Sequence, residues 1–183
     1  MRILGIDPGS SATGYGVVER RAGRLVHIAH GVVRPRAGTP LPSRLDHLYT
    51  AVTDVIAHHA PDCAVVEEVF VAASPRSALV LGQARGAILA AVARAGVPVN
   101  EYTPARIKRS VTGNGRATKQ QVKSMVKRLL ALDRVPASDA ADALAAAIAF
   151  ANAGRLESLG AGVDAGRRGP RAKAVAFSAR RVR

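Results

Sequence analysis

The sequence predicts an α/β fold in which a mixed, five-stranded central sheet carries helices on both faces. Three strand-like segments follow one another near the start, at residues 2–6, 13–19 and 24–33. Two more, at residues 63–66 and 97–102, alternate with long helical patterns. Consecutive strands imply a meander, and strands that alternate with helices imply parallel crossovers, so the sheet is expected to be mixed.

The first three strands are marked by the turns between them. The apolar run at residues 2–6 stops at Asp7-Pro8-Gly9, which is a turn sequence. The dipeptide Ala22-Gly23 between the second and third segments suits a hairpin.

The helices are expected from apolar residues spaced i, i+3 and i+4 and from small polar residues or proline at their starts. Pro61-Asp62 closes the first helix, Gly96 ends the second, and Gly113 to Gly115 break the third. The last is almost wholly apolar and is expected to run, buried, to about Asn152. The expected starts are Ser43, Ser74-Pro75, Thr103-Pro104, Thr118 and Ser138.

Composition predicts one folded domain, residues 1–152, followed by a basic Gly/Arg-rich tail, residues 153–183, that is expected to be disordered. The tail carries eight cations and two acids, and either adds non-specific DNA affinity or merely aids solubility. A single cysteine, Cys63, and no signal-like start favour the cytoplasm. No run of 18 uncharged apolar residues is present, so no membrane span is expected.

The charge balance points to a polyanionic partner. Lys and Arg number 27 against 13 Asp and Glu, a formal net charge of +14. Such a chain is drawn to nucleic acid through its phosphates. Acids in apolar surroundings are therefore conspicuous, because near phosphates they most often hold a divalent metal ion.

Two of these acids are expected at one edge of the sheet. Asp7 ends the first strand, although Asp-Pro-Gly is equally compatible with a plain turn. The small residues that follow leave room near Asp7 for a backbone or a phosphate. Glu67 and Glu68 end the fourth strand, and the period of two lets only one of them face the site.

Asp139 and Asp142 lie three residues apart in the first turn of the last helix and project on one face. Acids also stabilise helix starts without any function. However, a buried helix with two unpaired acids needs a compensating cation. Together the acids supply three or four oxygen ligands, which two Mg²⁺ or Mn²⁺ ions about 4 Å apart can share for phosphodiester hydrolysis.

Six short motifs occur in order over residues 1 to about 152. They are residues 3–10 (ILGIDPGS), 13–16 (TGYG), 41–45 (LPSRL), 67–70 (EEVF), 77–86 (SALVLGQARG) and 139–145 (DAADALA). In these motifs and in their order the sequence resembles the RuvC family of Holliday junction resolvases, within the RNase H-like superfamily.

The resemblance implies an RNase H-like fold and a homodimeric, Mg²⁺- or Mn²⁺-dependent endonuclease that cuts two opposed strands of a four-way junction. It also implies work in DNA recombination and repair with the branch-migration proteins RuvA and RuvB. It assigns Asp7, Glu67, Asp139 and Asp142 as catalytic metal ligands, with Glu67 preferred over Glu68. The expected DNA contacts are Phe70, Arg76, Lys108, Arg116 and Lys119.

Three other readings are weaker. Actin-like ATPases and sugar kinases share an Asp near Gly after the first strand, but need two such halves. A junction-binding protein without cleavage would be expected to lack some of the carboxylates, and YqgF-like nucleases lack the LGQARG helix. The five histidines have no cysteine partners and are not expected to bind metal.

Overall fold

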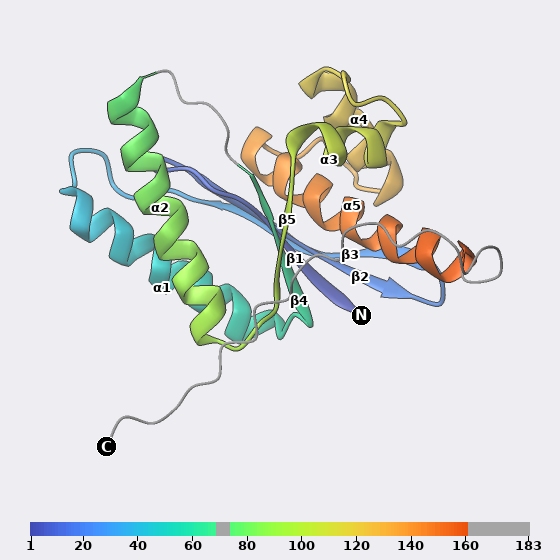
Figure 1. Cartoon of the computed structure of the whole chain (residues 1–183), viewed down its shortest axis with the longest axis horizontal. Helices are drawn as coiled ribbons and strands as arrows, with labels where there is room; N and C mark the ends of the chain where they lie inside the picture. Colours follow the sequence, from blue (N-terminus) through green and yellow to red (C-terminus); the bar gives the residue numbers. More distant parts are fainter. Residues whose placement is uncertain (69–73, 161–183) are drawn as a thin grey trace.

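The computed structural model describes residues 1–68 and 74–160, with side chains to residue 153 (Figure 1). Phe70 and residues 161–183 of the expected tail lie outside the described residues. The elements in chain order are β1 (Arg2–Asp7), β2 (Thr13–Arg21), β3 (Arg24–Val33), α1 (Leu41–His59), β4 (Cys63–Glu67), α2 (Pro75–Arg94), β5 (Val99–Tyr102), α3 (Pro104–Thr112), α4 (Lys119–Leu129) and α5 (Ser138–Gly160).

The five strands form one sheet in the order β3-β2-β1-β4-β5. The β1, β2 and β3 strands pair antiparallel, whereas β1–β4 and β4–β5 are parallel. The predicted mixed, five-stranded sheet is therefore confirmed. The carboxyl ends of β1 and β4 meet at one edge, because Ile6 pairs with Val66.

Helices cover both faces of the sheet, as predicted. Figure 1 shows α1 and α2 on one side, and α5 on the other with α3 and α4 beyond it. Each face of the sheet has its own hydrophobic core, and the side chains of β1 point alternately into one and the other. Leu4 and Ile6 pack on the α1–α2 side, whereas Ile3 belongs to the core around α5.

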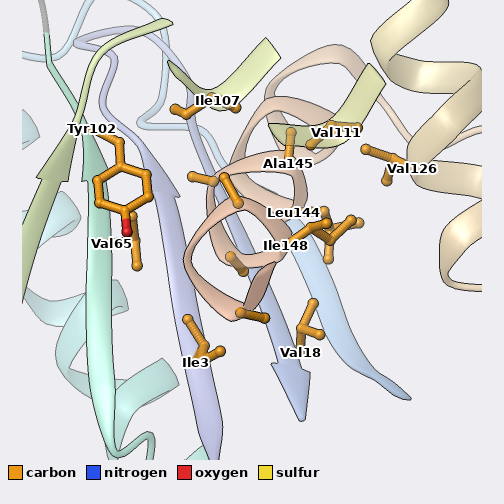
Figure 2. Packing of buried hydrophobic residues seen from close by; sticks show 14 of the residues in the cluster. Ile3, Val18, Val65, Tyr102, Ile107, Val111, Val126, Leu144, Ala145 and Ile148 are labelled. Carbon is orange, nitrogen blue, oxygen red and sulfur yellow. The ribbon is translucent and has the colours of Figure 1, made fainter. Parts of the chain in front are cut away.

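Helix α5 lies between the sheet and the α3–α4 pair. Figure 2 shows Leu144 and Ile148 among residues of the strands on one side and of α3 and α4 on the other. Between residues 143 and 151 the helix carries apolar side chains all round, as expected for a segment covered on both sides. Among the described residues, no helix is long and apolar enough to cross a membrane.

Three expected boundaries were wrong. Ser43 does not cap α1, which begins at Leu41 after Pro40 without a side-chain cap, because proline is tolerated in the first helical turn. β5 begins at Val99, since Pro98 has no N–H to donate to a ladder. α5 continues past Asn152 to Gly160, because one interior glycine costs only about 1 kcal/mol.

Candidate active site

Asp7 and Glu67 lie at the ends of neighbouring parallel strands and on the same face of the sheet. Side chains alternate between the two faces of a strand, so Asp7 lies on the same face as Ile3 and Gly5, and Glu67 lies on the same face as Val65. Ile3 and Val65 both pack in the core around α5, so the two carboxylates face the α5 side.

Glu68 continues the ladder beyond β4, because its N–H donates to the Tyr102 carbonyl at 2.9 Å. Alternation therefore directs the Glu68 side chain away from Asp7, toward the α1–α2 face. Of the two adjacent glutamates, the structure brings Glu67 to the other acids.

Gly14 brings the start of α5 onto the sheet beside Asp7. Gly14 is the β2 partner of Asp7 in the antiparallel register. A Cβ at Gly14 would lie 1.9 Å from the carbonyl oxygen of Asp139 and 2.2 Å from its carbonyl carbon. The first turn of α5 therefore rests directly on this glycine, and places Asp139 and Asp142 above the strand ends. The small residues after Asp7 were expected to leave space for a backbone or a phosphate, and the backbone of α5 occupies that space at Gly14.

The turn after Asp7 is held from two directions. The buried Thr13 hydroxyl donates to the Gly9 carbonyl at 2.8 Å and accepts the Gly9 N–H at 3.3 Å. From α1, the Arg44 guanidinium donates to the Ser10 carbonyl. These contacts fix the backbone that follows Asp7.

The four acids repel one another in a partly desolvated setting. Burial raises the pKa of Asp7 from 3.8 to about 7, and the charges of Glu67, Asp142 and Asp139 add to the rise. Burial likewise raises the pKa of Glu67 to about 7, with Asp142 contributing. Burial also raises the pKa of Asp142, which Lys119 counteracts. The site thus favours a bound proton or cation.

Cations surround the acids, contrary to the expectation that Asp139 and Asp142 are unpaired. Lys119 Nζ lies 3.6 Å from Asp142 Oδ2, and Arg34 Nη2 lies 3.6 Å from Asp139 Oδ2. Both cationic side chains are largely exposed, at 75% and 60%. Since exposed side chains remain hydrated, they neutralise the acids only weakly.

Lysines of α3 and α4 also reach the acids through their charge. Lys108 lowers the pKa of Glu67, and Lys123 lowers that of Asp142, in each case against the larger effect of burial. Sequence reasoning missed Lys123 and Arg34. Lys123 could have been found, because it follows Lys119 by four residues on the same helix face. No sequence signal pointed to Arg34.

The donor set fits a hard divalent cation in its chemistry. All four candidate ligands are carboxylates, which Mg²⁺ and Mn²⁺ prefer. Burial, together with repulsion from neighbouring acids, raises the pKa of three of them, Asp7, Glu67 and Asp142, so the site would gain from a bound cation. In residues 1–68 and 74–160, however, no three Asp, Glu, His or Cys side chains gather closely enough to hold an ion as they stand. Two of the acids point instead at Arg34 and Lys119.

The expected DNA contacts fall into three groups. Lys108 and Lys119 lie beside the acids. Arg76, in the first turn of α2, and Arg116, whose N–H donates to Asn114 Oδ1 at 2.9 Å between α3 and α4, are exposed. Phe70 belongs to the undescribed segment after Glu68.

Comparison with known proteins identifies a family for this chain. The family model described as "Crossover junction endodeoxyribonuclease RuvC" matches residues 3–150. A curated relative of that name from Alkalilimnicola ehrlichii is 57% identical over 147 residues, covering 80% of this chain and 88% of the relative. Another from Cupriavidus metallidurans is 51% identical over 154 residues, covering 84% and 85%.

Solved structures agree with the sequence comparison. The structure titled "T. thermophilus RuvC in complex with Holliday junction substrate" superposes with a TM-score of 0.80 at 35% identity, covering 86% of this chain and 97% of the other. The yeast mitochondrial resolvase Ydc2 shares the fold, with a TM-score of 0.62 at 12% identity over 86% and 82%.

Proposed function

This chain belongs to the RuvC family of crossover junction endodeoxyribonucleases, and we propose that it resolves Holliday junctions by cutting two opposed strands in a metal-dependent reaction. Its role would be in DNA recombination and repair. The observation that carries the proposal is the placement of four carboxylates, from β1, β4 and α5, at one edge of the sheet, where the charges of the other three raise the pKa of Asp7. The Thermus thermophilus relative has been solved with a Holliday junction, which supports the same substrate here.

Asp7, Glu67, Asp139 and Asp142 would hold two Mg²⁺ ions, for which Mn²⁺ can substitute. When bound, the ions would supply Lewis-acid stabilisation of the charge that develops at the phosphodiester and on the attacking water. Asp7 and Glu67 come from paired strand ends, so their backbone positions are rigid. Asp139 and Asp142 would turn from Arg34 and Lys119 toward the ions.

The lysines have a separate role in holding the substrate. Lys119 and Lys108 lie close enough to the acids to change their pKa values, so a phosphate drawn to these lysines lies next to the carboxylates. Lys119 is 75% exposed and only loosely paired with Asp142, which leaves it available to the DNA backbone. Arg76, Arg116 and Phe70 would contact the junction further from the acids.

We further propose a homodimer, because two opposed cuts need two sites related by the junction's own two-fold symmetry. The exposed side of α2 suits such an interface. Leu79 is 65% exposed, and a Cβ at Gly82 or Gly86 would meet no atom within 4 Å. Association with RuvA and RuvB, and action in the cytoplasm, follow from this function and belong to the same proposal.

The test is cleavage of a synthetic four-way junction in Mg²⁺, with one strand labelled and the products mapped. Wild type should nick two opposed strands symmetrically near the crossover. Asp7→Asn should bind the junction yet lose cleavage by at least about 100-fold, because the removed carboxylate acts in the chemical step. Asp54→Asn, an identical change at an exposed position of α1, should cut like wild type.

Competition with linear duplex tests the junction preference. At about 0.1–0.2 M salt the charge of the protein alone binds any DNA, so equal affinity for duplex and junction would refute junction selectivity. Junction binding by wild type without Mg²⁺-dependent cleavage would refute the nuclease and indicate a structural junction-binding protein. Cleavage by Asp7→Asn at the wild-type rate would refute the site.

A further inference from the structure

Arg34 lies at the active-site end of the sheet although nothing in the sequence singles it out. It directly follows β3, and Val33 at the end of β3 pairs with Thr13, which adjoins Gly14, the partner of Asp7. The carboxyl end of β3 therefore lies at the same sheet edge as those of β1 and β4. From there, Arg34 Nη2 approaches Asp139 Oδ2 to 3.6 Å.

The ion pair between Arg34 and Asp139 is suited to exchange. The arginine side chain is 60% exposed and the aspartate side chain 32% exposed, so water competes for both charges. Exposed pairs of this kind contribute little to stability and are easily broken. If Asp139 were to hold a cation instead, the guanidinium would lose its partner and would be available to another anion.

The position of Arg34 complements that of the lysines. Lys108 comes from α3, which follows β5, and Lys119 and Lys123 come from α4. Arg34 directly follows β3, which is the opposite edge strand of the sheet. A DNA strand laid across the acids would then meet positive charge from α3 and α4 and from the β3 edge as well. A planar guanidinium can hold a phosphate through two parallel hydrogen bonds.

We propose that Arg34 is a DNA-phosphate-binding residue that Asp139 holds in place until DNA arrives, and that it then transfers from the carboxylate to the DNA backbone. This inference rests on the proposed function, because it requires DNA to lie across the four acids. It adds a contact on the β3 side of the site and gives Asp139 a second role, as the resting partner of Arg34.

The test measures junction affinity by fluorescence anisotropy in EDTA, so that no cleavage takes place. Arg34→Ala is expected to weaken binding about 5-fold at 0.1 M salt, as for the loss of one phosphate contact. The plot of log affinity against log salt should become shallower by about 0.9. Arg34→Lys should keep most of the salt slope, because the positive charge remains.

Arg24→Ala is the matched control. Arg24 is also exposed, but it begins β3 at the end remote from the acids, whereas Arg34 directly follows the other end of the strand. Arg24→Ala therefore removes the same charge at a distance from the site. It should change affinity by less than about 2-fold and leave the salt slope nearly unchanged. Equal effects of Arg24→Ala and Arg34→Ala would overturn the inference, since net charge alone would then explain both.

The transfer itself is tested by combining Arg34→Ala with Asp139→Asn. If Arg34 must leave Asp139 to reach the phosphate, breaking the ion pair cancels part of the binding free energy that the phosphate contact supplies. In the Asp139→Asn protein there is no ion pair to break. Arg34→Ala should therefore weaken junction binding by a factor at least about 2-fold larger in Asp139→Asn than in wild type. A smaller or equal factor would overturn the transfer. Thermal melts of each variant check that folding is unchanged.

The two proposals fail in different ways. If wild type shows no junction preference, the proposed function fails whatever Arg34 does. If wild type prefers and cuts junctions but Arg34→Ala binds them with wild-type affinity and salt slope, only the role of Arg34 is refuted.

Discussion

Replacing Asp7 by asparagine should make the metal-free protein more stable at pH 8. Burial and the neighbouring acids raise the pKa of Asp7 from 3.8 to about 7 in the folded protein. The folded state therefore binds the Asp7 proton more tightly than the unfolded state does. The contribution of Asp7 to the free energy of unfolding falls as pH rises from about 4 to about 7 and stays constant at higher pH. At about 1.36 kcal/mol per pKa unit, the full effect is roughly 4 kcal/mol. A neutral amide at position 7 escapes this loss.

The assay is urea unfolding in EDTA between pH 5 and 8.5, comparing wild type, Asp7→Asn and Asp54→Asn. The difference in unfolding free energy between wild type and Asp7→Asn cancels the titration of the histidines, which both proteins share. That difference should grow by about 2–3 kcal/mol in favour of Asp7→Asn between pH 5 and pH 8, because the part of the loss below pH 5 has already occurred. Asp54→Asn, on the exposed side of α1, should follow wild type at every pH.

A pH-independent difference would refute the reasoning, because it would mean that Asp7 titrates alike in the folded and unfolded states. Lower stability of Asp7→Asn at pH 8 would refute it more directly. The ionised carboxylate would then be making favourable interactions in the metal-free protein. Either result would also remove the main electrostatic support for a cation site at the strand ends.

Three further predictions concern the same site. Millimolar Mg²⁺ or Mn²⁺ should raise the melting temperature more at pH 8 than at pH 5.5, because the carboxylates must be deprotonated to bind the ion. EDTA should reverse this increase, and the absence of any increase at either pH would contradict the metal site. Glu67→Gln should slow junction cleavage at least about 100-fold and Glu68→Gln less than about 3-fold, and the reverse order would exchange their roles. Gly14→Ala should lower the free energy of unfolding in urea by about 2–4 kcal/mol, because the new Cβ would clash with the backbone of Asp139. Gly86→Ala is the control and should raise that free energy by up to about 1 kcal/mol, because its Cβ meets open space and alanine favours the helix. A Gly14→Ala protein of wild-type stability would contradict the close packing of α5.

Local sequence patterns predicted the elements well and their ends less well. Strand β3 and the caps at Ser74, Thr103 and Thr118 were found where turn and capping residues are explicit. The start of α1 was missed, because its cap is a backbone geometry at Pro40 and no polar side chain marks it. Such ends are decided by packing of the whole element, which a single residue type does not report.

The acids were identified by sequence, but their surroundings were not. Motif order and the apolar character of α5 pointed to Asp7, Glu67, Asp139 and Asp142. The expectation that Asp139 and Asp142 are unpaired was wrong, because cations reach them from the residue that follows β3 and from α4. A charge brought from another element leaves no trace in the spacing of the acids themselves.

The sequence by itself determined the class of fold, the family and the acids that face one edge of the sheet, because strand period, turn residues and motif order are local properties. Only the tertiary structure decided that Glu67 and not Glu68 joins Asp7, that α5 rests on Gly14, and that Arg34 stands opposite Asp139. These three facts depend on register and close packing between segments far apart in the chain. Such contacts are selected by the fit of whole surfaces, and no local pattern encodes that fit.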